Sequence, residues 1–91
     1  MTFPAIDQEY LLNFLTGLLN TPSPTGFAHR AIDFTANTLS SFPALRLSRT
    51  RKGALVATWP GQRSDAPRAL TAHVDTLGAM VKEVKPGGRL K

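Results

Sequence analysis

The chain of 91 residues contains no cysteine, which excludes disulfide bonds and thiolate metal sites. It has only two histidines and six acidic residues, so a metal ion would have to be held by imidazole, carboxylate or carbonyl groups. No run reaches the roughly 18 apolar residues that a membrane span needs. The first residues also lack the basic leader and apolar run of a signal peptide. We therefore expect a cytoplasmic protein with no membrane partner.

The composition is that of an ordinary soluble domain, with 42% hydrophobic and 19% charged residues. The length allows one small domain or a piece of a larger one. A net charge of +5 raises the possibility of nucleic-acid binding, but the basic residues are spread along the chain. Their one cluster comprises Arg46, Arg49, Arg51 and Lys52. No zinc-finger or RNP-like pattern accompanies it. We interpret it as a solvated hairpin surface and expect no nucleic-acid partner, with a small basic binding module as the alternative.

Two helices are predicted in the first 40 residues. Asp7 is a suitable N-cap for the first, and its apolar residues recur at helical spacing: Leu11, Phe14, Leu15, Leu18 and Leu19. The loop Pro22–Gly26 ends it, because two prolines and a glycine cannot continue a helical ladder. The second helix is predicted over residues 27–39, with a buried stripe of small and apolar residues: Ala28, Ala31, Ile32, Thr35 and Leu39.

The pattern then changes to the alternation of strands. Residues 45–48 alternate apolar and polar side chains, and residues 54–59 follow the turn at Lys52–Gly53. These two runs predict an antiparallel hairpin. A polar, turn-rich loop separates the hairpin from residues 68–72, which are mostly small and apolar. That run suits a buried central strand.

The last part of the chain predicts one more strand over residues 78–84 and a turn at Lys85–Gly88. Helices followed by strands predict an α/β layered fold with a sheet and a helical layer. Residues 89–91 read as the beginning of a further strand, which is not where a domain completes its core. We therefore expect the chain to be an N-terminal fragment.

His73 and Asp75 follow directly after the predicted central strand. Residues two apart in extended backbone point to the same side, and ligand sites in open α/β sheets gather beyond the carboxyl ends of strands. Neutral imidazole is a good ligand for zinc or cobalt, and a neighbouring carboxylate can orient the ring. The pair therefore suggests that His73 binds a metal and that Asp75 supports it. A lone His-x-Asp pair can equally be a capped turn histidine and a turn aspartate.

The segment around this pair resembles a known family. Residues 71–75 with residues 77–84 are similar to the "AH-x-DE-x-G-x-MVKEI" segment of metallopeptidase family 42. These are glutamyl and tetrahedral aminopeptidases, some of which once carried the names cellulase or endoglucanase. Leu18–Leu19 and the loop Pro22–Gly26 resemble the family's first helix and its "PS-x-SG" loop. The resemblance covers nearly the whole chain.

Some positions depart from that pattern. Thr76 stands where many members carry Glu, so "HVDTLG" is also similar to the "H-x-DTVP" of metallopeptidase family 20, the carboxypeptidase and deacetylase relatives. Gly78 and residues 80–84 favour family 42. Within it, the spelling is most similar to the branch found beside genes for the osmoprotectant N-acetylglutaminylglutamine amide.

The resemblance implies a two-metal aminopeptidase that hydrolyses N-terminal residues from peptides. In that family the matching histidine, here His73, ligates one of two divalent ions, zinc or cobalt, and the matching aspartate, here Asp75, assists catalysis. The remaining ligands and the general base would lie beyond residue 91, so the chain alone is expected to be inactive. The resemblance further implies a homo-oligomer. It also makes residues 1–77 part of the catalytic domain and residues 78–91 the lead into an inserted, β-rich domain.

Other features are interpreted as structural. Glu9, His29 and Glu83 are expected at the surface, and Trp59 is expected to pack in the core or at a sheet edge. The loop Pro22–Gly26 could contact the active site, but connections between two helices are commonly built this way, and we interpret it as such a connection. No residue is assigned to an organic cofactor.

Overall fold

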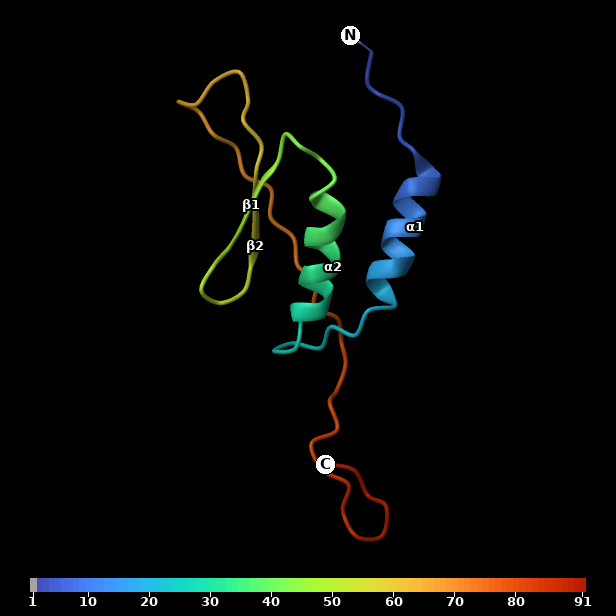
Figure 1. Cartoon of the computed structure of the whole chain (residues 1–91). Coiled ribbons are helices and arrows are strands. Elements are labelled where there is room, and N and C mark those ends of the chain that lie inside the picture. The colour runs from blue at the N-terminus through green and yellow to red at the C-terminus, as the bar shows by residue number, and fades with distance from the viewer. Residues whose placement is uncertain (1) are drawn as a thin grey trace.

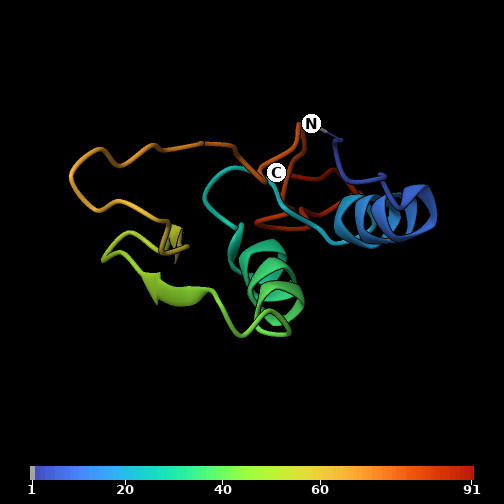
Figure 2. The same ribbon diagram turned by 90° about the horizontal axis from the view of Figure 1, so that it is seen from above.

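The computed structural model describes residues 2–91 and has four regular elements. They are α1 (Gln8–Leu19), α2 (His29–Leu39), β1 (Arg46–Arg49) and β2 (Leu55–Thr58). In Figures 1 and 2, α2 lies between α1 on one side and the hairpin of β1 and β2 on the other. The whole is elongated, with extents of 64 × 32 × 19 Å. Two helices beside an antiparallel pair confirm the predicted class, an α/β fragment of a layered domain.

The helix α1 begins where the sequence predicts. Asp7 is its N-cap, and the carboxylate of Asp7 accepts a hydrogen bond from the backbone N–H of Tyr10 at 3.0 Å. That contact satisfies one of the free donors of the first turn. The helix then contacts α2 through the rings of Phe14 and Phe34, whose centroids lie 5.6 Å apart. Gly17 leaves room for this approach, because a Cβ there would lie 2.6 Å from the ring of Phe34.

The helix α2 carries the small core of the chain. It begins two residues later than predicted, after Ala28, whose side chain cannot cap the first turn. Ala31 is fully buried, while the other members of the predicted stripe are half-buried. The charged residues Arg30 and Asp33 lie on the exposed side of the helix. None of the helices in the described chain is long and apolar enough to span a membrane.

The hairpin also matches its prediction. Its strands pair antiparallel, with Arg46 opposite Thr58 and Arg49 opposite Leu55. Gly53 adopts φ +91° in the turn, a backbone region that glycine enters without steric cost. The carboxylate of Asp33 accepts a hydrogen bond from the guanidinium of Arg49 at 2.7 Å and so connects α2 with β1.

The predicted central strand at residues 68–72 does not form. Within residues 2–91, no backbone hydrogen bond joins residues 59–72 to any other residue. Leu70 is fully exposed, and Trp59, expected to pack, is 76% exposed. The physical reason is that a buried strand needs partners on both edges and layers on both faces. The described residues provide neither around this segment, so the apolar run stays extended and solvated.

The predicted strand at residues 78–84 is also wrong over most of its length. Here the chain makes an isolated bridge between Val84 and Leu90. The predicted turn Lys85–Gly88 is confirmed, since the N–H of Gly88 donates to the carbonyl of Lys85 at 3.0 Å. Residues 82–91 therefore fold back on themselves as an irregular hairpin, which extends away from the helices in Figure 1. The predicted domain boundary after residue 77 stays a prediction.

Candidate functional site

The segment that carries His73 and Asp75 lies against the loop between the two helices. Pro24 and Thr76 form a parallel β-bridge, and the N–H of Thr76 donates to the carbonyl of Ser23 at 2.8 Å. The hydroxyl of Thr25 donates to Oδ2 of Asp75 at 2.9 Å. Our interpretation of this loop as a mere helix connection is therefore wrong. It contacts the candidate site and anchors the segment that contains the site.

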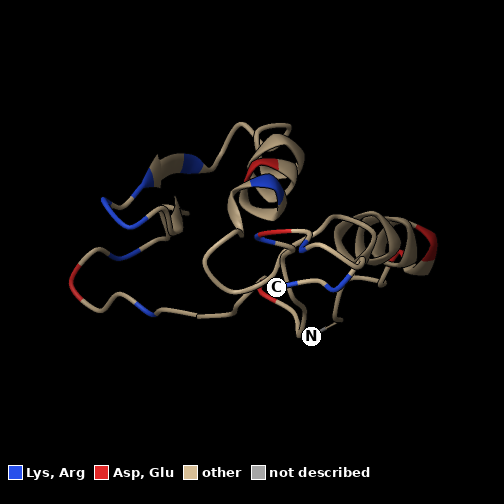
Figure 3. Cartoon of the chain, turned by 90° about the horizontal axis from the view of Figure 1, so that it is seen from below, with Lys and Arg blue, Asp and Glu red and all other residues tan. Residues whose placement is uncertain are grey.

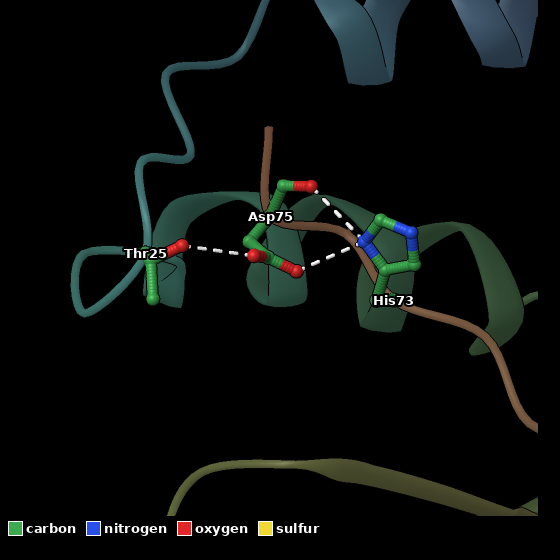
Figure 4. A network of polar contacts seen from close by, with 3 residues as sticks. All are labelled: Thr25, His73 and Asp75. Atoms are coloured by element: carbon green, nitrogen blue, oxygen red, sulfur yellow. Dashed lines mark hydrogen bonds and ion pairs between the residues drawn. The ribbon is translucent and has the colours of Figure 1, made fainter. Parts of the chain in front are cut away.

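The predicted pair is in direct contact (Figure 4). Nδ1 of His73 lies 2.9 Å from Oδ1 of Asp75 and 3.1 Å from the backbone carbonyl oxygen of Asp75. An ionised carboxylate and a carbonyl can only accept, so Nδ1 carries the proton in both contacts. The lone pair of the neutral ring is then on Nε2, which points away from Asp75 in Figure 4. The side chain of His73 is 83% exposed, so Nε2 is accessible to a ligand.

The electrostatics of the pair centre on the Asp75 carboxyl. Its pKa is lowered from the ordinary value, first by the hydrogen bond from Thr25 and next by the one from His73. Each bond stabilises the charged form, while the small loss of solvation opposes them. Asp75 is therefore ionised at neutral pH, which suits a carboxylate that holds an imidazole N–H.

This arrangement fits one metal ligand rather than a complete metal site. Across residues 2–91, no group of three or more histidine, cysteine or acidic side chains lies close enough to hold an ion. Glu9, His29 and Glu83 are exposed, as predicted, and none of them forms such a group with the pair. The geometry provides one atom for a metal ion, Nε2 of His73, which points away from Asp75, and one carboxylate, that of Asp75, which orients the ring. The juxtaposition of the two predicted residues is confirmed, and their roles stay predictions.

Sequence reasoning missed Thr25 as a contact of this site. Thr25 stands 50 residues before Asp75, and spacing alone does not connect positions so far apart. One signal was available, the resemblance of the loop Pro22–Gly26 to a loop of the family. Binding and catalytic residues lie disproportionately on loops, so this resemblance pointed to the site.

One of the four cations of the basic hairpin cluster has an acidic partner. Arg49 is paired with Asp33. Lys and Arg residues occur on the hairpin, on the loop after it and on the C-terminal segment, with acidic residues between them (Figure 3). Nucleic-acid binding relies on cations gathered on one face, and the expected absence of a nucleic-acid partner stays a prediction.

Two comparisons with known proteins agree with the motif. A sequence model described as M42 glutamyl aminopeptidase matches residues 53–91, which include His73, Asp75 and the turn at residues 85–88. "Putative aminopeptidase YhfE" of Bacillus subtilis (strain 168) is 45% identical over 80 residues. That alignment covers 88% of this chain and 23% of the relative, so the chain spans about a quarter of the relative's length. The segment with the His73–Asp75 pair thus lies inside the matched region, and both matches support membership of the M42 glutamyl aminopeptidase family.

Proposed function

We propose that the chain is the N-terminal part of a two-metal, aminopeptidase-like hydrolase that removes N-terminal residues from peptides. The observation that carries the proposal is the contact between Nδ1 of His73 and the carboxylate of Asp75, with Nε2 directed away. Membership of the family supplies the reaction class. It favours this function over a carboxypeptidase or deacetylase of family 20 and over a basic binding module.

The proposal assigns separate roles to the two residues. His73 binds one of two divalent ions, zinc or cobalt, through Nε2. Asp75 keeps the imidazole in the Nδ1–H tautomer and raises its basicity, as carboxylates beside metal-binding histidines do. A bound ion would supply Lewis-acid polarisation of the scissile carbonyl. Residues 1–77 would belong to the catalytic domain and residues 78–91 would lead into an inserted domain. A cytoplasmic location and a homo-oligomeric state are further proposals.

A chimera tests the assignment. In it, this chain replaces the matched 80 residues of the relative, so that the rest of the family's length is present. We expect metal-dependent hydrolysis of an aminoacyl-p-nitroanilide that a chelator abolishes. His73→Ala should remove at least one bound metal ion, measured by elemental analysis. Asp75→Asn should weaken metal affinity by about 10- to 100-fold, because it disturbs only the residue that supports the ligand.

The matched control is His29→Ala, which removes an exposed imidazole that forms no metal-binding group with the pair and should leave metal content unchanged. Unchanged metal content in the His73→Ala chimera would reject the ligand assignment. The 91-residue chain alone should show no zinc-dependent aminopeptidase activity, because one histidine and one aspartate cannot hold two metals. Activity from the pure chain would contradict the proposal that the remaining metal ligands lie outside it.

A further inference from the structure

The contact between the loop Pro22–Gly26 and the segment that carries His73 has two parts. The first is made by backbone: the bridge of Pro24 with Thr76, and the hydrogen bond from Thr76 to Ser23. Ser23 is 2% exposed, so this backbone contact is shielded from water. The second part is a side-chain hydrogen bond, the one from Thr25 to Asp75. The backbone part sets where the segment lies, but it does not set the rotation of a side chain within it.

The carboxylate of Asp75 is held on both of its oxygens. Thr25 donates to Oδ2 at 2.9 Å, and Nδ1 of His73 lies 2.9 Å from Oδ1 (Figure 4). With one oxygen bound to the loop, rotation about the Cβ–Cγ bond would break the contact with Thr25. The other oxygen is thereby kept in the direction of the ring. No hydrogen bond joins Thr25 to His73, so the hydrogen-bonded path from its hydroxyl to the imidazole passes through Asp75.

We propose that Thr25 is a positioning residue, whose hydroxyl holds the Asp75 carboxylate against Nδ1 of His73 and so keeps Nε2 unprotonated and directed outward. This deepens the proposed function, since an outward lone pair is what a metal ligand requires. The tautomer of the ring does not depend on whether a metal binds, however. The inference can therefore be tested in the 91-residue chain without metal and without substrate.

The decisive measurement is the tautomer ratio of His73, read from long-range ¹H–¹⁵N NMR spectra of the full chain at a pH where the ring is neutral. The wild-type chain should show mainly the Nδ1–H form. Thr25→Val keeps the branched shape and removes the hydroxyl. We expect it to lower the ratio of Nδ1–H to Nε2–H by about fivefold, the factor that corresponds to one net hydrogen bond. Thr25→Ser keeps a hydroxyl and should retain the wild-type ratio.

Two references accompany these variants. His29 reports from the same spectra, and its ratio should stay constant in every variant. Thr50→Val is the matched control, because the Thr50 hydroxyl also makes an exposed hydrogen bond, from the N–H of Ala54 at 3.0 Å, but in the hairpin. It should leave the ring of His73 unchanged. Thr25 is exposed, so its replacement opens no cavity, and circular dichroism checks that the helices persist.

The results separate the two proposals. A wild-type ratio in Thr25→Val, a mainly Nε2–H ring in the wild-type chain, or a Thr25→Ser variant that behaves like Thr25→Val would each overturn the positioning role. If Thr25→Val lost helical structure, Thr25→Ala and Thr25→Ser would be compared in its place under the same criteria. A changed ratio together with unchanged metal content in the His73→Ala chimera would retain the positioning role and reject metal binding. The opposite pair of results would retain metal binding and reject the role of Thr25.

Discussion

Two parts of the chain, residues 8–58 and residues 59–91, differ in where their backbone groups find hydrogen-bond partners. From residue 8 to residue 58, helices and a hairpin form with partners close in sequence. From residue 59 onward, the backbone of the described chain is extended or irregular, apart from the folded-back segment at residues 82–91. Both parts contain apolar runs. Apolar composition therefore does not explain why the first part is regular and the second is not. The separation in sequence between a backbone group and its hydrogen-bond partner does.

A helix closes its hydrogen bonds four residues away, and a hairpin closes them across a short turn. A central strand of a layered sheet requires neighbours from elsewhere and cover on both faces. Leu70 and Leu77 are fully exposed, and most of the apolar residues of α1 are more than two-fifths exposed. Apolar surface of this extent is what further polypeptide covers in a complete domain. This agrees with a chain that spans 23% of its relative.

The comparison predicts that stability resides in the first part, and a buried charge should show this most strongly. Ala31 is the fully buried apolar residue of α2. Ala31→Asp would place an unpaired carboxylate there and should cost about 3 kcal/mol or more, with loss of the helical circular dichroism signal. Asn37→Asp adds the same charge on the exposed side of the same helix and should cost about 0.5 kcal/mol. Equal losses in both variants would show that α2 has no buried side.

A glycine substitution made in each part sharpens the comparison. Gly53 in the hairpin turn has φ +91°, whereas Gly61 in the extended part is not in the left-handed region. A Cβ meets no atom within 4 Å at Gly53 and only a carbonyl oxygen at 3.9 Å at Gly61, so conformation alone distinguishes the two. Gly53→Ala should lower the free energy of unfolding in urea by about 1 kcal/mol. Gly61→Ala should leave it unchanged, and a larger effect at Gly61 would contradict the comparison.

Two ion pairs provide a smaller test. Arg49 joins Asp33 between β1 and α2, whereas Arg63 joins Asp65 two residues away in the extended part. Arg49→Ala should lower stability by about 0.5 kcal/mol, because the pair is exposed and partly screened. Its effect should diminish in high salt. Arg63→Ala should not change the urea midpoint, since its pair orders only its own loop. The reverse ranking would place the stabilising contacts in the second part.

The same contrast explains what could be predicted from the sequence. The start of α1 at Asp7 and the hairpin turn at Gly53 follow from local chemistry, and both are confirmed. The strand at residues 68–72 was predicted from its apolar run, but its formation depends on partners that the run does not contain. At the candidate site, the contact between His73 and Asp75 follows from their spacing of two. The contact of Thr25 with Asp75 does not follow from spacing, because the fold brings together residues 50 apart.

The smallest effect concerns the side-chain contact that joins the two parts, the hydrogen bond of Thr25 with Asp75. The folded pKa of Asp75 is below the ordinary value of 3.8, with Thr25 as the largest cause. A lowered folded pKa stabilises the fold fully above the unfolded value, and this contribution is lost as the pH falls through the folded value. The connection between the two parts should therefore persist at neutral pH and weaken only below pH 3.8.

Carboxyl carbon shifts measured by NMR against pH should place the wild-type Asp75 titration below 3.8. In Thr25→Val the titration should move up toward that value, because the main hydrogen bond to the charged form is gone. Asp65 is the internal control: its pKa is lowered by Arg63, so the same substitution should leave it in place. If the pKa of Asp75 did not change in Thr25→Val while the pKa of Asp65 stayed low, the backbone bridge of Pro24 with Thr76 would be enough to connect the two parts. The Thr25 hydroxyl would then have no influence on the carboxylate.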